Sequence, residues 1–133
     1  MNKIPFDEMF QLALAIRQNA YAPFSKFSVG ACILTDSGRF YTGCNVENTS
    51  FPLGQCAETN AIGTMVCHGE RKIAAAVIIA DCEPLISPCG GCRQQLAEFS
   101  DPDTMIYLCN PQGRHQLYKM AELLPYSFKF DRK

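Results

Sequence analysis

The chain has 133 residues, of which 47% are hydrophobic and 19% are charged, and its formal net charge is -1. This length and apolar content predict a single domain over residues 1–133 with a packed core. The balanced charge, with no basic run, is unlike that of a nucleic-acid-binding groove, so we expect no nucleic-acid partner.

The start of the chain becomes acidic at Asp7 and Glu8 before any apolar run, which is unlike a secretory signal peptide. The uninterrupted apolar run of residues 73–80 is far shorter than a transmembrane helix requires. We therefore expect a soluble protein of the cytoplasm with no membrane partner.

Hydrophobic spacing divides the chain into alternating helices and strands. The expected helices cover residues 6–19, 56–68 and 89–99, with a helical turn at 121–124. The expected strands cover residues 27–35, 40–45, 73–80, 104–109 and 115–118. The continuous apolar runs 73–80 and 104–109 are typical of strands that are covered on both faces. The pattern predicts an α/β protein, a three-layer α/β/α sandwich with a five-stranded mixed sheet.

Eight cysteines would allow four disulfides in a secreted protein. Because no leader is expected and the core is large enough to fold unaided, reduced thiols are favoured. Five of the cysteines are expected to be buried as small apolar side chains. These five are Cys32, Cys44, Cys67, Cys82 and Cys109.

The other three cysteines occur in two short motifs, Cys56-Ala57-Glu58 and Pro88-Cys89-Gly90-Gly91-Cys92, each at the start of an expected helix. Cys89 and Cys92 are three residues apart and therefore lie on one helix face, where they can bind one ion. Helix starts meet at the carboxyl ends of strands in such folds, and their partial positive charge favours thiolate over thiol. Cys56, Cys89 and Cys92 therefore predict a zinc site.

The predicted site has three protein ligands, whereas zinc usually takes four. A vacant fourth position is typical of catalytic zinc, which lowers the pKa of a bound water to about 7. Glu58 lies two residues from Cys56, so it points in another direction from the helix and can lie beside the metal without binding it. We interpret Glu58 as the catalytic proton carrier.

Three other interpretations of the cysteines remain open, and the first is that they are buried thiols that bind no metal. A structural zinc site needs a fourth ligand, and the two histidines, His68 and His115, are expected away from the motifs as surface or internally bonded side chains. A thioredoxin-like redox pair of Cys89 and Cys92 leaves the motif at Cys56 unexplained. A non-catalytic zinc domain that acts as a binding module is the alternative that is not an enzyme.

The two motifs resemble the signature of the zinc-dependent cytidine deaminases, namely His or Cys, one residue, Glu, and later Pro-Cys-x-x-Cys. The resemblance is collinear over nearly all of the chain, roughly residues 21–128. Residues 21–31 are similar to the family's entry into its first strand, residues 45–48 to its ribose loop, and residues 123–128 to its tail. The resemblance implies one zinc per subunit. It also implies hydrolytic deamination of cytidine and deoxycytidine to uridine and deoxyuridine, as in pyrimidine salvage.

The mechanism that the resemblance implies begins with attack of zinc-bound hydroxide on C4 of the cytosine. Glu58 takes the proton, delivers it to N3 and then to the leaving amine. Phe27 packs on the nucleoside, while Asn45 and Glu47 bind the sugar hydroxyls. Backbone groups near Ala57 and from Ser87 to Cys89 bind the pyrimidine edge. From spacing alone, Asn45 and Glu47 are ordinary loop residues, so their assignment to the sugar comes from the resemblance.

The end of the chain carries a further implication. In the family, the aromatic residue that matches Phe128 reaches the pocket of a neighbouring subunit, so the resemblance implies a homotetramer with shared active sites. The alternative is that Phe128 only packs in an interface. Phe24, in contrast, is expected in the hydrophobic core.

Two positions depart from the family pattern. Thr59 stands where many members with three cysteine ligands carry Arg, and Phe51 stands where relatives often carry Tyr. Three thiolates make the site negative, which weakens the Lewis acid. We therefore expect a lower intrinsic rate or an altered substrate preference, with Arg93 and the two helix starts as partial compensation. The missing tyrosine hydroxyl removes a polar contact at the ribose end.

The substrate class has two alternatives. A modified cytosine nucleoside, as for blasticidin-type aminohydrolases, would need the same chemistry. A polynucleotide is disfavoured, because binding its backbone needs clustered basic residues.

Overall fold

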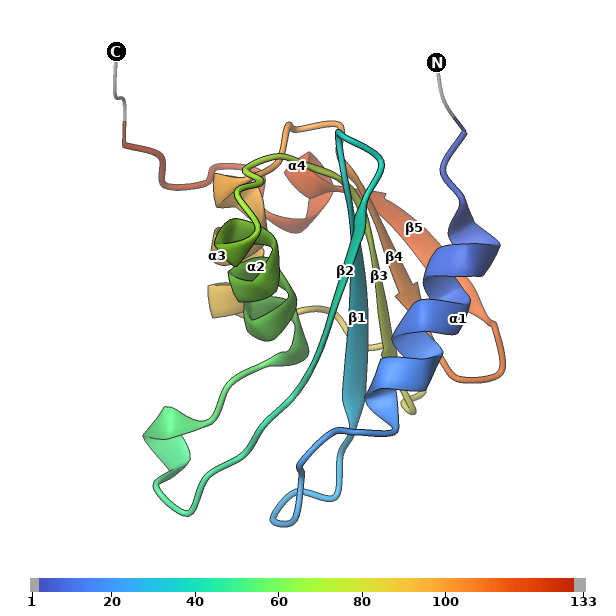
Figure 1. Cartoon of the computed structure of the whole chain (residues 1–133), viewed down its shortest axis with the longest axis vertical. Coiled ribbons are helices and arrows are strands. Elements are labelled where there is room, and N and C mark those ends of the chain that lie inside the picture. Colours follow the sequence, from blue (N-terminus) through green and yellow to red (C-terminus); the bar gives the residue numbers. More distant parts are fainter. Residues whose placement is uncertain (1–2, 131–133) are drawn as a thin grey trace.

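The fold is built around a five-stranded mixed sheet with helices on both of its faces (Figure 1). The computed structural model describes residues 3–130, so both ends of the expected domain, residues 1–2 and 131–133, lie outside the described residues. The strands are β1 (Val29–Thr35), β2 (Phe40–Cys44), β3 (Ile73–Ala80), β4 (Met105–Cys109) and β5 (His115–Lys119). The helices are α1 (Phe6–Arg17), α2 (Ala57–Cys67), α3 (Gly90–Glu98), α4 (Met120–Leu123) and the 3-10 turn η1 (Phe51–Leu53).

The strand directions bring three strand ends together. The order across the sheet is β2-β1-β3-β4-β5. β1 is antiparallel to both β2 and β3, β3 is parallel to β4, and β5 is antiparallel to β4. β2, β3 and β4 therefore run in the same direction, and their carboxyl ends lie at the same end of the sheet. In α/β folds this is the end where ligands bind.

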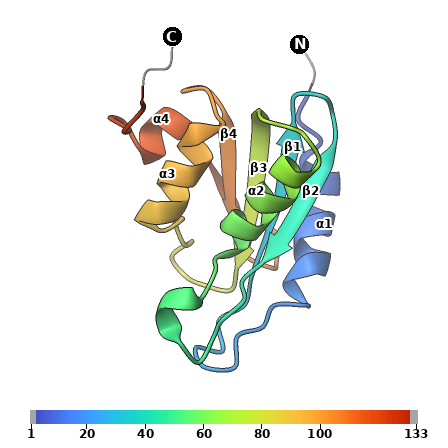
Figure 2. The ribbon, with the colours of Figure 1, turned by 60° about the vertical axis from the view of Figure 1, so that its left-hand side comes forward.

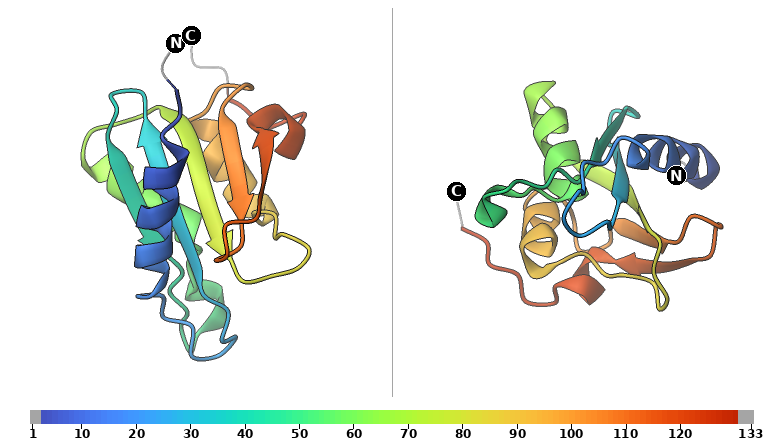
Figure 3. Two further views of the ribbon diagram at one scale, coloured as in Figure 1. Left: turned by 90° about the vertical axis from the view of Figure 1, so that its right-hand side faces the viewer. Right: turned by 90° about the horizontal axis from the view of Figure 1, so that it is seen from below.

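The helices divide between the two faces of the sheet, which confirms the predicted three layers (Figures 2 and 3). α1 covers one face, where Met9 and Ala13 share a buried cluster with Val77 of β3. α2 and α3 cover the other face, where Met65 and Leu96 belong to a second buried cluster, and α4 lies beside α3. Both faces of β3 are thus covered, which explains its continuous apolar sequence.

The structure confirms the predicted elements, although α1 and β1 are shorter than expected. β1 begins at Val29 rather than at Phe27. Lys26 has a left-handed φ of 61°, so extended backbone cannot continue back beyond Phe27. The Asn45 side chain also binds this segment, since its Nδ2 donates to the Phe27 carbonyl at 2.8 Å. A side-chain contact between distant residues therefore decides where the strand starts.

The burial predicted for the five remaining cysteines is only partly correct. Cys32 and Cys109 are buried, and burial raises the pKa of each thiol to about 12. Cys44 and Cys82 are partly exposed, and Cys67 is exposed. Cys67 is the last residue of α2, where the helix ends at the surface, so its burial was predicted wrongly.

The prediction that Phe24 lies in the core is also wrong. Its side chain is 47% exposed and makes an edge contact with Phe51, with 5.6 Å between the ring centroids. The two loops that carry these rings extend beyond the carboxyl end of β2 (Figure 1), so no second layer lies over them. Phe51 itself is 72% exposed.

No helix within residues 3–130 has the length and apolar character that crossing a bilayer would need.

The backbones of β2 and α2 approach each other closely at Gly43, and a substitution there tests this packing. A Cβ at Gly43 would lie 2.4 Å from the Ala61 nitrogen and 2.5 Å from the Ala57 carbonyl oxygen. Because both neighbours are backbone atoms, we expect Gly43→Ala to lower the free energy of unfolding by about 3 kcal/mol. Urea unfolding followed by circular dichroism measures this change.

Gly63→Ala is the matched control within α2. A Cβ at Gly63 meets nothing within 4 Å, so the substitution is expected to raise the free energy of unfolding by about 0.5–1 kcal/mol. Equal stability of Gly43→Ala and the unmodified protein would contradict the close packing of β2 on α2.

Candidate active site

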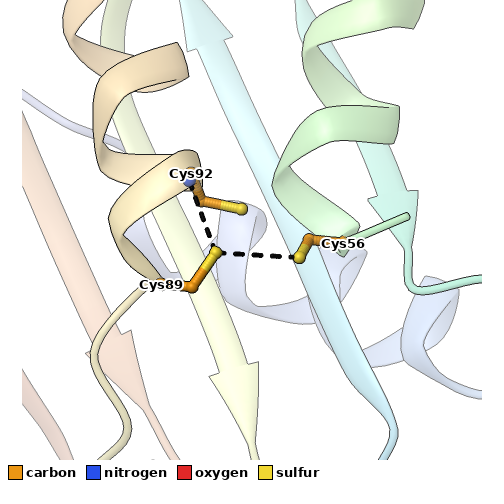
Figure 4. A group of neighbouring side chains, drawn as sticks. All are labelled: Cys56, Cys89 and Cys92. Atoms are coloured by element: carbon orange, nitrogen blue, oxygen red, sulfur yellow. Dashed lines mark hydrogen bonds between the residues drawn. The ribbon is translucent and has the colours of Figure 1, made fainter. Parts of the chain in front are cut away.

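Two helix starts carry the three cysteines. Cys56 is the N-cap of α2 and Cys89 is the N-cap of α3, both with extended backbone. Cys92 lies in the first turn of α3, and its main-chain N–H donates to the Cys89 Sγ at 3.4 Å. α2 follows the loop after β2, and α3 follows the loop after β3. Because β2 and β3 end on the same side of the sheet, the two helix starts are neighbours (Figure 4).

The spacing of the sulfur atoms fits a metal ion. The Cys56 and Cys89 Sγ atoms are 3.9 Å apart, and all three Sγ atoms lie within 4.8 Å of one another. Tetrahedral zinc with bonds of about 2.3 Å separates two sulfurs by about 3.8 Å. In the part of the chain that the structure describes, no fourth histidine, cysteine or carboxylate joins this cluster. The donor set therefore fits zinc with one position left for a non-protein ligand.

The electrostatics of the cluster favour a thiolate at Cys56, whereas hydrogen bonding to Cys56 and burial raise the pKa of Cys92. Hydrogen bonding from Cys92 lowers the pKa of Cys56 to about 6, with a further contribution from Cys89. The N-terminus of α2 adds positive potential at the same sulfur. A thiolate is the form that binds metal, so the lowered pKa of Cys56 favours cation binding at neutral pH.

Glu58 lies in the first turn of α2 and is only 5% exposed. Burial raises the pKa of its carboxyl above the ordinary value, and the charge of Cys56 adds to that shift. A carboxyl with a raised pKa holds a proton more readily than an exposed glutamate, which suits proton transfer near neutral pH.

The cysteines and Glu58 line one pocket of about 370 Å³. Its wall also includes Phe27, Asn45, Glu47 and Ala57, which all come from the sequence-predicted set. Residues that sequence reasoning did not assign complete it: Ser25, Val29, Gly54, Gln55, Ile78 and Ile86. The pocket thus unites all the predicted site residues of one chain except Phe128.

Asn45 and Glu47 hold the loop before β1 over this pocket. The Asn45 Oδ1 accepts from the Val29 N–H at 2.9 Å, and its Nδ2 donates to the Phe27 carbonyl. The Glu47 carboxylate accepts from the N–H groups of Phe24 and Ser25 at 3.0 and 3.1 Å. It also accepts from the Ser25 hydroxyl, and this bond lowers the pKa of Glu47.

Phe128 lies outside the pocket of its own chain. Its side chain is 73% exposed, and its carbonyl accepts from the Gln94 Nε2 at 2.9 Å. The histidines are also remote from the cysteines, as expected. The His68 Nδ1 is 2.9 Å from the Thr64 carbonyl at the far end of α2, and the His115 Nδ1 is 3.0 Å from the Gly113 carbonyl.

Residues 6–109 match the family model for the cytidine and deoxycytidylate deaminase zinc-binding region. The chain belongs to this deaminase family. The match contains both cysteine motifs and ends with β4, so the similarity that was expected after residue 109 lies outside it. The candidate zinc site is therefore that of a deaminase domain, and the family match supports zinc as the metal.

Individual deaminases match over most of their length. A cytidine deaminase of Sporosarcina psychrophila is 43% identical over 112 residues, which cover 84% of this chain and 82% of the relative. One of Halalkalibacterium halodurans is 41% identical over 116 residues, covering 87% and 88%. The crystal structure of cytidine deaminase from Burkholderia pseudomallei has a TM-score of 0.89 at 37% identity, covering 94% of this chain and all of that one.

The metal site of the deaminase domain can be tested by metal analysis. We expect one zinc per chain in the purified protein and less than one in Cys89→Ala, because two sulfurs bind zinc more weakly than three. Cys67→Ala is the control, since this exposed cysteine is at the other end of α2. Full zinc content in Cys89→Ala would show that Cys89 is not a ligand.

Proposed function

We propose that the protein is a cytidine deaminase, which hydrolyses cytidine and deoxycytidine to uridine and deoxyuridine with release of ammonia, as in pyrimidine salvage. The observation that carries the proposal is the position of one buried carboxyl, Glu58, in the same pocket as three zinc-type sulfurs. The deaminases of similar sequence support cytidine as the substrate.

We assign the metal to Cys56, Cys89 and Cys92, and the proton transfers to Glu58. Zinc, when bound, acts as a Lewis acid that makes a water molecule nucleophilic at neutral pH. Glu58 accepts one proton of this water and donates it to N3 of the cytosine. It then accepts the remaining hydroxyl proton at C4 and donates it to the departing amine, which leaves as ammonia. Its buried position supports this role, because a raised pKa lets the carboxyl both hold and release a proton.

We assign the nucleoside to the remaining wall of the pocket. Phe27 offers an apolar surface for the base, and the main chain at Ala57, in the first turn of α2, offers polar groups to its edge. Asn45 and Glu47 are assigned to the sugar hydroxyls. The Glu47 carboxylate retains acceptor capacity beyond its bonds to the Ser25 segment, because an ionised carboxylate has about four lone-pair sites.

We further propose that the enzyme is a cytoplasmic homotetramer. Phe128 is exposed beyond the pocket of its own chain, and the neighbouring Tyr126 is 99% exposed. An exposed aromatic tail outside the pocket of its own chain supports a contact with a second copy. The proposed partners are therefore a nucleoside and identical subunits, with neither nucleic acid nor membrane.

A modified cytosine nucleoside, as for blasticidin-type enzymes, is the second candidate substrate. A second cavity, of about 360 Å³, shares Ser25, Glu47 and Gly54 with the first and is walled by Phe24 and Phe51. A bulky group on the sugar side would have apolar surface available there. Higher kcat/KM for such a nucleoside than for cytidine would favour this candidate.

Glu58→Gln tests the proposed reaction. The substituted side chain cannot carry a proton, so we expect kcat for cytidine to fall by at least about 10³-fold while zinc content is unchanged. The fall in ultraviolet absorbance as cytidine becomes uridine measures the rate. A non-catalytic zinc domain would show no cytidine turnover even before the substitution.

Glu47→Gln tests the assignment of the sugar. The neutral amide is a weaker acceptor, so KM for cytidine should rise about tenfold with a smaller change in kcat. Glu70→Gln is the control, because Glu70 also accepts from hydroxyls, those of Ser37 and Tyr41, but it does not line the pocket. An equal rise in KM in both variants would contradict a direct contact between Glu47 and the sugar.

A further inference from the structure

Arg93 makes a set of contacts that the proposed reaction does not use. It follows Cys92 in the first turn of α3, and its side chain extends back toward the start of the helix, as helical side chains do. The Nε donates to the Pro88 carbonyl at 2.9 Å, and one Nη donates to the Ser87 hydroxyl. The other Nη donates to the Leu123 carbonyl at 3.0 Å, at the end of α4.

These contacts are with neutral acceptors. No ion pair joins Arg93 to a carboxylate within residues 3–130. The guanidinium was expected to offset the charge of the thiolates, but its hydrogen bonds go to oxygen atoms of three other residues. The contacts therefore indicate that the group holds backbone and side-chain oxygens in position.

Two of the three acceptors belong to the pocket wall. Ser87 and Pro88 line the pocket that contains the cysteines and Glu58. Pro88 is buried, so its carbonyl cannot be solvated freely and depends on a protein donor. Arg93 supplies the shorter of the carbonyl's two hydrogen bonds, at 2.9 Å, and the Ser87 hydroxyl supplies the other, at 3.4 Å.

The segment that Arg93 binds has little other support. In the described chain, no main-chain to main-chain hydrogen bond outside helices and strands involves residues 83–88. Side chains fix this loop at two places. Near its start, Glu83 accepts from Arg114 at 2.6 Å and from Asn110 at 3.1 Å. Near its end, Ser87 and Pro88 are held by Arg93.

The third acceptor connects the wall to the other end of the chain. Leu123 is buried at the end of α4, which lies beside α3 (Figure 2). The guanidinium therefore joins the loop after β3, the first turn of α3 and the last helix at one point. Only a planar group with several N–H donors in fixed directions reaches three such acceptors at once.

We propose that Arg93 is a positioning residue for the deamination: it holds the Ser87 and Pro88 wall of the pocket that contains Glu58 against α4. This inference rests on the proposed function. Arg93 does not touch the substrate in this arrangement, so its effect passes through the loop. The loss of its hydrogen bonds should loosen the wall and weaken nucleoside binding before it affects the metal.

The test compares Arg93→Met and Arg93→Lys with the unmodified zinc-loaded protein. Three quantities are measured: zinc per chain, KM and kcat for cytidine, and amide hydrogen exchange at residues 92 and 93, whose N–H groups donate to Cys89 at the end of the loop. For Arg93→Met we expect unchanged zinc, a KM about tenfold higher with a smaller change in kcat, and faster exchange at these residues. Arg93→Lys keeps the charge but not the fork of donors, so it should restore only part of the binding.

Arg71→Met is the matched control. Arg71 also donates to two main-chain carbonyls, those of Val66 and Glu70 at 3.1 and 2.9 Å, but at the far end of α2. It should leave KM and the exchange of residues 92 and 93 unchanged. Ser87→Ala removes one acceptor without removing the arginine, and it should give a smaller increase in both quantities. This variant keeps the proposal testable if Arg93→Met does not fold.

Several results would overturn the proposal. Unchanged KM and exchange in folded Arg93→Met, or in Ser87→Ala if the first variant does not fold, would show that Arg93 does not position the wall. Loss of zinc with unchanged exchange, or full restoration by Arg93→Lys, would show that its charge acts on the metal site instead. If the unmodified protein does not deaminate cytidine, the proposed function fails, whereas the exchange measurement still decides whether Arg93 holds the loop.

Discussion

The site depends on the contact between two helix starts that are far apart in the sequence. Cys56 caps α2 and Cys89 caps α3, and their sulfurs meet at 3.9 Å only because β2 and β3 end on the same side of the sheet. Gly43 lets the backbone of β2 approach the first turns of α2 without a side chain between them. The metal site is thus set by the packing of a helix on a strand as much as by its ligands.

This contact concentrates negative charge in one place. Three sulfurs and a buried carboxyl share a pocket, and the residue after Glu58 is Thr59 rather than a cation. The positive potential of two helix starts is the nearest compensation. The raised pKa of Glu58 is a direct consequence, because burial and the adjacent Cys56 both disfavour its ionised form. A carboxyl in this state can transfer protons near neutral pH.

The remaining wall of the pocket is made of loops, and polar side chains determine their shape. Asn45 and Glu47 bind main-chain groups of residues 24–29, and Arg93 binds the Ser87 hydroxyl and the Pro88 carbonyl. Asn45 and Glu47 line the pocket and hold one loop of its wall, while Arg93 holds a second loop without lining the pocket. A rigid sheet with loops held by buried or half-buried polar groups is a common way to build a preorganised binding site.

The sequence by itself determined the helices and strands, the three cysteines, Glu58 and the family, because hydrophobic period and motif spacing are local properties. Only the tertiary structure decided that Phe24 and Cys67 are exposed and that β1 starts at Val29. It also decided which groups Arg93 binds, since its partners lie up to 30 residues away. Burial and hydrogen bonding depend on which distant segments come into contact in the folded chain. Local sequence patterns do not specify these contacts.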